Sequence, residues 1–278
     1  MPLICCLTRK TKNSVTLQDK TQAMHPIIFE TPYFSIKAYG LFVAMGFLAG
    51  LGFALREARQ QGLDPQPILD LAFYIILAAI IGARLFYVLT NLDSYRHNPL
   101  DILKVWQGGL TFFGGFILSF IAGVVYMKRH QMAVWKTFDL FAPALALGDF
   151  FGRIGCFFAG CCYGQECSYP WAVIFTDPQS LARIGVALHP TQLYSSLASL
   201  ATFLLLWAWS SRKTFDGQLA LLWIFLYSFS RIIIEYFRGD PRGYLILGTF
   251  AISQVIALLL MVISMVMYAV FKKRSQAI

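Results

Sequence analysis

Seven long apolar segments, separated by short polar ones, dominate the pattern of residues along the chain. Each is long enough to cross a bilayer as a helix, because a crossing takes about 20 apolar residues. The connections are short except for one at about 159–191, which carries several polar residues and three prolines. The pattern predicts an all-α, polytopic integral membrane protein with about seven spans and a short outer segment. The spans are expected at about 36–55, 68–90, 110–127, 138–158, 192–210, 218–237 and 246–271.

The first 23 residues differ from the rest of the chain. A short apolar run comes before Arg9, Lys10 and Lys12, whereas a secretory signal has its charges before its apolar core. No signal peptide is therefore predicted. Met24 begins a stretch that runs directly into the first apolar segment. We expect residues 1–23 to be a disordered extension or a start-site artefact, and residues 24–278 to form a single transmembrane domain with an outer loop at about 159–191.

The composition agrees with a membrane protein, since 58% of the residues are hydrophobic and 13% are charged, against roughly a quarter charged in soluble domains. The net charge of +9 would suggest nucleic acid as a partner of a soluble protein. Here the basic residues lie mostly between apolar segments, where they set membrane orientation, so we exclude nucleic acid.

Orientation follows from the distribution of Lys and Arg between alternate connections. The poorer set holds five, Arg96, Lys104, Arg183, Arg238 and Arg242, once the region up to Lys37 is set aside. Because the richer set is expected in the cytoplasm, the N-terminus and the 159–191 loop are predicted outside and the C-terminus inside. The richer set holds ten residues: Arg56, Arg59, Lys128, Arg129, Lys136, Arg212, Lys213, Lys272, Lys273 and Arg274.

Several charged residues lie inside the predicted spans, where each costs about 2.5–3.5 kcal/mol on insertion scales. Asp149 and Arg153 are four residues apart, so a helix places them on one face. An internal ion pair and a functional site both account for that pair. Arg231, Glu235 and Arg238 are expected on one stripe that carries an excess of positive charge, which favours an anion as its partner.

Every deep cation in these spans is an arginine, whose planar fork of donors matches the oxygens of a phosphate. Under the predicted topology, Arg84, Arg153 and Arg231 all approach the outer half of the bilayer. The spacing therefore favours a site for an anionic lipid or a phosphate among them.

Residues 148–164 combine five glycines with three cysteines, and Cys167 follows shortly after. Glycines at such intervals let helices or a ligand approach the backbone closely. The cysteine spacing does not match common zinc motifs, so no metal is predicted. Cys156 and Cys162 are expected as small buried residues, whereas a disulfide across the outer loop stays open for Cys161 and Cys167.

The sequence HPTQLY at residues 189–194 stands just before the fifth span. A histidine in this position is either an interfacial group or a functional one, and the sequence leaves both open. A capping or interfacial role is the more frequent one, and the neighbouring outer loop, which carries Gly and Pro, strengthens the functional alternative.

Together these motifs resemble the prolipoprotein diacylglyceryl transferase family of bacterial inner membranes. The resemblance extends from about residue 27 to 270, and its order and spacing make it specific, with a recurrent cysteine-containing form of the GRIG segment. It rests on Tyr39-Gly40, Gly82-Ala83-Arg84, residues 105–115, Asp139 with Ala142-Pro143, GRIG at 152–155, HPTQLY at 189–194, residues 230–238 and Ser253-Gln254.

The resemblance implies an enzyme that transfers the diacylglyceryl group of phosphatidylglycerol to the lipobox cysteine thiol of a prolipoprotein. The products are a thioether and glycerol 1-phosphate, and no cofactor or metal is required. The implied partners are phosphatidylglycerol, prolipoproteins with a lipobox cysteine, and membrane lipids.

By the same resemblance, Arg153 and Arg231 are expected to hold the phosphate and stabilise the leaving group. Glu235 orients Arg231, and His189 is a candidate proton acceptor. Further contacts to the substrates are expected from residues in the matching motifs: Tyr39, Arg84, Gly108, Gly109, Gly114, Gly115, Gln192, Tyr194 and Arg238.

The chain departs from the family pattern at several positions. Many members have a histidine where this chain has Phe113, which cannot accept a proton. The motif's Asn is Cys156, its Glu is Cys161, and the Glu after HPxQLY is Ser195. The proton acceptor is then His189, a phosphate oxygen or water, unless the acceptor thiol arrives already ionised beside Arg153.

Two hypotheses from other classes remain. In a membrane thiol–disulfide oxidoreductase, Cys156, Cys161, Cys162 and Cys167 would be the redox groups, and Arg153→Ala would be tolerated. A non-catalytic lipid-binding or prolipoprotein-binding paralogue would bind phosphatidylglycerol without releasing glycerol 1-phosphate. A transporter is less favoured, because the spans show no paired broken segments and no internal repeat.

Overall fold

The computed structural model describes residues 25–31, 35–96, 99–104, 108–240, 244–246 and 250–276. Among these residues, seven helices are long and apolar enough to cross a membrane, which confirms the predicted multi-pass helical fold. The expected extension at 1–23 lies outside the described residues. The helices are α1 (Ala38–Gln60), α2 (Gln66–Thr90), α4 (Phe112–Arg129), α5 (Val134–Ala159), α6 (Thr191–Ser210), α7 (Gln218–Glu235) and α8 (Ile252–Gln276).

Short strand pairs, which the apolar pattern did not predict, accompany the helices in the described residues. They are β1 (Ile27–Glu30) with β2 (Ser35–Lys37), β3 (Val173–Ile174) with β4 (Ala187–Leu188), and β5 (Tyr244–Ile246) with β6 (Phe250–Ala251). The last pair explains why α8 begins at Ile252 rather than at about 246. A short helix, α3 (Leu92–Tyr95), and a 3-10 turn, η2 (Pro99–Leu103), follow α2.

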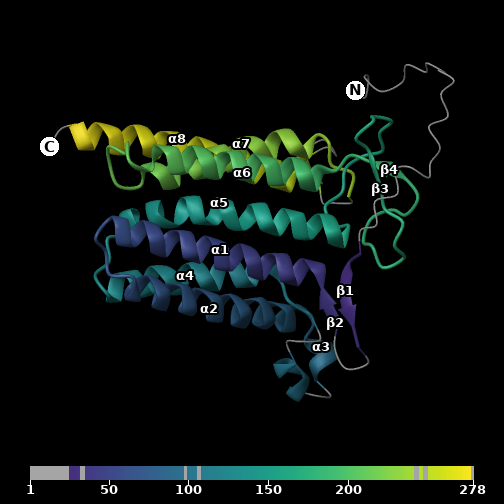
Figure 1. Cartoon of the computed structure of the whole chain (residues 1–278). Coiled ribbons are helices and arrows are strands. Elements are labelled where there is room, and N and C mark those ends of the chain that lie inside the picture. The colour runs from purple at the N-terminus through teal and green to yellow at the C-terminus, as the bar shows by residue number, and fades with distance from the viewer. Residues whose placement is uncertain are drawn as a thin grey trace.

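The long helices lie side by side in a layered bundle (Figure 1). Helices α1 and α5 form the middle, with α2 and α4 on one side and α6, α7 and α8 on the other. Strands β1 to β4 and helix α3 lie at one end of the bundle, which we call the hairpin end. The richer set of basic residues lies toward the opposite end, in or next to the helix termini there.

Small residues let α1 and α5 approach each other closely. The buried positions of α1 recur every four residues from Gly46 to Ala58. A Cβ atom on Gly46 would lie 2.8 Å from the carbonyl oxygen of Gly148, and one on Gly50 would lie 2.8 Å from that of Ala144. Because lipid offers no hydrophobic drive for helices to associate, such close van der Waals packing stabilises the pair.

Glycines also form the contact between α2 and α4. A Cβ atom on Gly82 would meet the backbone of Gly114, and one on Gly115 would lie 2.9 Å from the carbonyl oxygen of Ala79. Gly114 and Gly115, both expected at a substrate site, are thus buried in a helix–helix contact in this structure.

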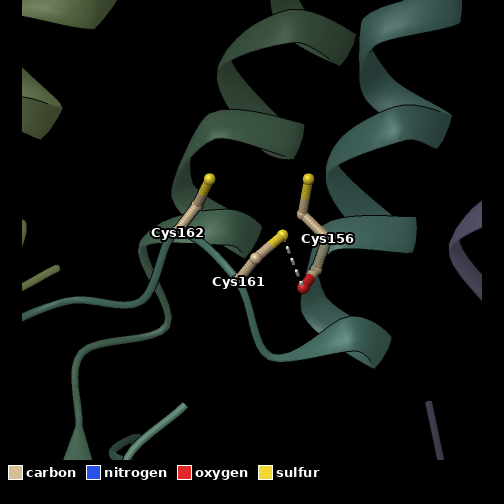
Figure 2. Close-up of side chains that lie close together, drawn as sticks. All are labelled: Cys156, Cys161 and Cys162. Atoms are coloured by element: carbon tan, nitrogen blue, oxygen red, sulfur yellow. Dashed lines mark hydrogen bonds between the residues drawn. The ribbon is translucent and has the colours of Figure 1, made fainter. Parts of the chain in front are cut away.

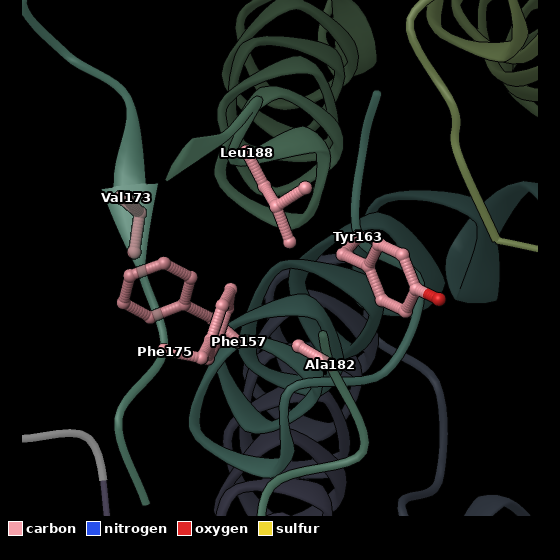
Figure 3. Close-up of a cluster of buried hydrophobic side chains, with 6 residues drawn as sticks. All are labelled: Phe157, Tyr163, Val173, Phe175, Ala182 and Leu188. Carbon is pink, nitrogen blue, oxygen red and sulfur yellow. The ribbon is translucent and has the colours of Figure 1, made fainter. Parts of the chain in front are cut away.

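The predicted outer loop is a folded segment that covers the ends of α5 and α6. Its centre is a cluster of buried side chains that includes Phe157 and Leu188 (Figure 3). Strands β3 and β4 pair antiparallel, and His189 and Gln165 are joined by a backbone hydrogen bond of 2.9 Å. The full cluster is Phe157, Tyr163, Val173, Phe175, Ala182 and Leu188.

Candidate active site

An ion pair on α5 forms the first part of the site. Arg153 donates from Nε to Oδ1 of Asp149 at 3.1 Å, one helical turn away. Ser199 of α6 donates to the other carboxylate oxygen of Asp149 at 2.6 Å. The carboxylate is thus held from a second helix, and it fixes the direction of the Arg153 guanidinium.

The second part of the site is an ion pair on α7. Arg231 and Glu235 are also one turn apart, with Nη2 and Oε2 separated by 3.0 Å. Their side chains are 13% and 6% exposed, so the pair lies inside the bundle. Both i, i+4 pairs expected from the sequence are therefore present.

The two arginines line one narrow crevice between α5, α6 and α7. Its cavity is about 10 Å³, which is roughly the room that one water molecule needs. Any larger anion would therefore have to displace side chains at the crevice to reach both guanidinium groups. The lining residues are Asp149, Arg153, Ser195, Ser199, Tyr227, Ser230, Arg231 and Ile234.

Arg238 does not continue the stripe of Arg231 and Glu235, which corrects the expectation from spacing. Helix α7 ends at Glu235, and the chain then turns so that Arg238 forms a β-bridge with Gly164. The buried guanidinium makes two hydrogen bonds to Asp240, at 2.9 and 3.0 Å. Asp240 was not predicted, although an acid two residues after a buried arginine is a signal for it.

Arg84 does not lie with Arg153 and Arg231 but between α2 and the segment that follows it. Its buried guanidinium donates to the carbonyl oxygens of Asp101, Ile102, Gly108 and Gly109 at 2.6 to 3.2 Å. The expectation that the three arginines surround one phosphate is therefore wrong for Arg84. Gly108 and Gly109 adopt positive φ values of 92° and 69°, which present their carbonyl groups to Arg84.

His189 lies in an aromatic group at the hairpin end. Its Nδ1 is 3.1 Å from the Tyr194 hydroxyl, which also accepts a hydrogen bond of 2.9 Å from Trp171. The rings of Tyr169 and Phe237 pack against it. Burial lowers the pKa of His189, so its neutral form, the one able to accept a proton, is favoured.

The residues after His189 support the turn that follows α5. Gln192 donates to the carbonyl oxygen of Cys161 at 2.9 Å, and Thr191 donates to that of Cys162 at 2.7 Å. Both side chains are buried. The HPTQLY motif therefore positions the cysteine segment, a role that the sequence did not indicate.

Three cysteines meet at this turn (Figure 2), and their sulfur atoms lie within 4.8 Å of one another. Cys156 is buried, as expected, whereas Cys162 is half-buried. Hydrogen bonds from Cys156 and Cys161, together with the charge of Arg238, lower the pKa of the Cys162 thiol. Cys161 and Cys167 are both free thiols, so the disulfide left open by the sequence is not formed here.

Tyr39 lies in the first turn of α1, at the same end of the bundle. Its backbone packs on Gly155 of α5, and the residue is 46% exposed. The hydroxyl is close enough to Arg153, Cys156 and Cys161 to interact with them electrostatically. Tyr39 therefore belongs to the surroundings of the arginine crevice and the cysteine turn.

Comparison with known proteins connects this site to one family. The profile of the family described as prolipoprotein diacylglyceryl transferase matches residues 26–270. The chain belongs to this family. Similar proteins named phosphatidylglycerol–prolipoprotein diacylglyceryl transferase include one from Clostridium tetani, 35% identical over 91% of this chain and 100% of the relative.

Further relatives with the same name come from other organisms. One from Acinetobacter baumannii is 33% identical over 89% of this chain and 93% of its own length. One from Synechococcus elongatus is 35% identical over 84% of this chain and 82% of its own length. The family match thus extends from before α1 into α8, and it does not favour the oxidoreductase hypothesis.

Proposed function

We propose that this protein transfers the diacylglyceryl group from phosphatidylglycerol to the lipobox cysteine of a prolipoprotein in the bacterial inner membrane. The observation that carries the proposal is the convergence of Arg153 and Arg231 on one crevice of a membrane bundle. Two guanidinium groups provide several donors for the oxygens of one phosphodiester. The relatives' names specify the same two substrates.

The reaction needs stabilisation of the departing phosphate. The acceptor thiolate attacks the glyceryl carbon next to the phosphodiester, the carbon–oxygen bond breaks, and glycerol 1-phosphate leaves as an anion. Donors that are already in place for this charge lower the barrier without reorganisation. Arg153 and Arg231 are the donors, and both are held by carboxylates on their own helices.

The other predicted residues take supporting roles in this proposal. Asp149 and Glu235 position the two arginines, and Tyr39 faces the bound headgroup. At the hairpin end, His189 accepts the proton and Tyr194 contacts the acceptor peptide. Arg84, Gly108 and Gly109 shape the segment after α2, and Gln192 and Arg238 hold the cysteine turn.

The test uses the detergent-purified full chain with phosphatidylglycerol and a lipobox peptide that contains one cysteine. Mass spectrometry should detect a diacylglyceryl group on the peptide, and free glycerol 1-phosphate should appear in equal amount. Arg153→Ala should lower the rate by about 10²–10³-fold, as the loss of one positioned donor does elsewhere. Arg183→Ala is the control, because that arginine forms an exposed ion pair with Glu166.

Two outcomes would contradict the proposal. Bound phosphatidylglycerol without any mass shift of the peptide would instead support the non-catalytic paralogue. Full activity in Arg153→Ala would remove the arginine crevice from the mechanism.

A further inference from the structure

The turn after α5 brings together sulfur atoms that the sequence separates. Helix α5 ends at Ala159 and is capped by Gly160, whose φ is 76°, and Cys162 also has a positive φ, 63°. These two residues reverse the chain, so Cys161 and Cys162 fold back beside Cys156 in the last turn of the helix (Figure 2). The result is a group of three thiols from a segment of seven residues.

The spacing of these sulfur atoms suits a shared metal ion. Zinc binds thiolate sulfur at about 2.3 Å in a tetrahedral arrangement, which places two such sulfur atoms about 3.8 Å apart. Here all three lie within 4.8 Å of one another, so small rotations of the side chains suffice. A disulfide would join two of them at about 2.05 Å and leave the third thiol without a role.

The backbone of the turn is fixed by the neighbouring helix. The side chains of Thr191 and Gln192 in the first turn of α6 hold the carbonyl groups of Cys162 and Cys161. The side-chain oxygen of Gln192 is itself buried and has no hydrogen-bond partner among the described residues. Such support from rigid elements is typical of a site that holds its ligands in a set geometry.

Two guanidinium groups lie near the three thiols. Arg238 forms a hydrogen bond with the sulfur of Cys162, and Arg153 interacts electrostatically with Cys156 and Cys162. An ion of charge +2 bound by three thiolates leaves one negative charge, which these guanidinium groups would stabilise. The group of thiols is therefore next to the arginine crevice rather than remote from it.

We propose that Cys156, Cys161 and Cys162 bind one zinc ion, whose fourth ligand is the thiol of the acceptor peptide. Thiolate ligands select soft or borderline ions such as zinc, and catalytic zinc sites keep one position open beside three protein ligands. This proposal departs from the expectation that no metal is present, which rested on the spacing of the cysteines and on the family resemblance.

The role of the fourth ligand rests on the proposed transferase function. A thiol that coordinates zinc loses its proton, which here passes to His189 at the hairpin end, directly or through water. The thiolate then forms the carbon–sulfur bond while the carbon–oxygen bond breaks, and its electron pair leaves with the phosphate oxygen. The thioether product is a weaker zinc ligand and dissociates. In this way a metal supplies the activation that Phe113 cannot.

The first experiment measures zinc in the full chain, purified in detergent under reducing conditions without chelator. Elemental analysis by inductively coupled plasma mass spectrometry should find about one zinc ion per chain, as expected for a site with three thiolates. Cys161→Ser and Cys162→Ser should each lower the zinc content by about tenfold or more. Cys167→Ser is the matched control and should keep it, since Cys167 lies outside the group.

Three results would overturn the zinc site. The first is that the wild-type protein contains no zinc or contains another metal. The second is that both serine variants retain zinc, and the third is that two of the three cysteines form a disulfide. Circular dichroism of each variant establishes that it has folded. The zinc content of the wild-type protein tests the site even where a variant does not fold.

The second experiment tests the fourth ligand with cobalt in place of zinc. Adding a lipobox peptide with cysteine should change the visible absorption of the bound cobalt, whereas the same peptide with serine should not. No difference between the peptides would overturn the role of the acceptor thiol. Neither measurement requires transfer, so a spectral response without a peptide mass shift would contradict only the proposed function.

Discussion

A guanidinium inside a helix bundle has to be neutralised and hydrogen-bonded, and Arg153 achieves both through Asp149. Removing one member of such a pair leaves the other as an uncompensated buried charge. Ser199 adds a hydrogen bond from α6, so the orientation of Arg153 depends on residues from two helices.

This dependence leads to a prediction for Asp149→Asn. The substitution keeps the shape of the side chain but removes its charge, so Arg153 is held less firmly. We expect kcat/KM for transfer to fall by about tenfold, which corresponds to about 1.4 kcal/mol. Ser199→Ala should have a smaller effect in the same direction, because a neutral hydrogen bond contributes about 0.5–1.5 kcal/mol.

The control for these variants is Ser119→Ala on α4, whose hydroxyl donates an exposed hydrogen bond to the carbonyl oxygen of Phe116 in the same helix. Unchanged kcat/KM in Asp149→Asn would show that Arg153 does not need its carboxylate.

Because His189 at the hairpin end is titratable, we predict that the transfer rate depends on pH. Burial lowers the pKa of His189 from its usual value near 6.5, so the residue stays neutral at pH 6.5 and above. If it accepts the proton, the transfer rate should be constant there and fall at lower pH, with a midpoint below 6.5. His189→Gln should lower the rate and abolish this acidic decline.

The same shift has a consequence for stability. Between the two pKa values the unfolded chain binds more protons than the folded one, so stability falls as the pH decreases from about 6.5 toward the folded pKa. Melting curves of the wild type and His189→Gln over this range separate the effect on stability from the effect on rate. An acidic decline that persists in the variant would exclude His189 as the proton acceptor.

At the scale of the elements, the contact between α1 and α5 places Tyr39 beside Arg153 and the cysteine turn. This contact depends on residues without large side chains. Gly46 faces α5 directly, whereas a Cβ atom on Gly52 would meet nothing within 4 Å. The two glycines therefore offer a matched comparison within one helix.

We predict that Gly46→Val destabilises the bundle and that Gly52→Val does not. The valine at position 46 would meet the carbonyl oxygen of Gly148 at 2.8 Å and the Cβ atom of Phe151 at 2.9 Å. Overpacking of this kind costs about 1–3 kcal/mol. Thermal unfolding in detergent measures the difference, and both variants have the same change in helix propensity. Equal melting temperatures would show that α1 does not pack on α5 through Gly46.

At the scale of the whole molecule, the ten basic residues of the richer set gather at the end of the bundle opposite the hairpins. Each of these residues lies near a helix terminus, and the order of the helices places all of these termini at the same end of the bundle. Basic residues near span ends are retained in the cytoplasm. The arginine crevice and the cysteine turn would then face the outer half of the membrane.

Reporter fusions in bacterial cells test this orientation. A green fluorescent protein fused after Gln276 should fluoresce, and alkaline phosphatase inserted at Arg183 should be active, because each reporter works on one side of the membrane only. Alkaline phosphatase inserted at Arg212 is the control and should be inactive. The reverse pattern would place the active site on the cytoplasmic side.

Much of the molecule could be predicted because it depends on short distances along the chain. The seven spans follow from continuous apolar stretches, and the pairs Asp149–Arg153 and Arg231–Glu235 follow from the helical repeat. The prediction that Arg238 lies on one stripe with Arg231 and Glu235 was wrong, since nothing in the spacing showed that α7 ends at Glu235. The strand pairs were missed because runs of two to four residues carry too little pattern.

What the sequence determined by itself is the membrane fold, its span order and the family, since each rests on composition and ordered motifs. Only the tertiary structure decided which charges share a crevice. It separated Arg84 from Arg153 and Arg231, because Arg84 donates to the carbonyl groups of residues 101, 102, 108 and 109. It also brought three sulfur atoms together, because the turn at Gly160 and the support from α6 reverse the chain there, and no local repeat encodes such a reversal.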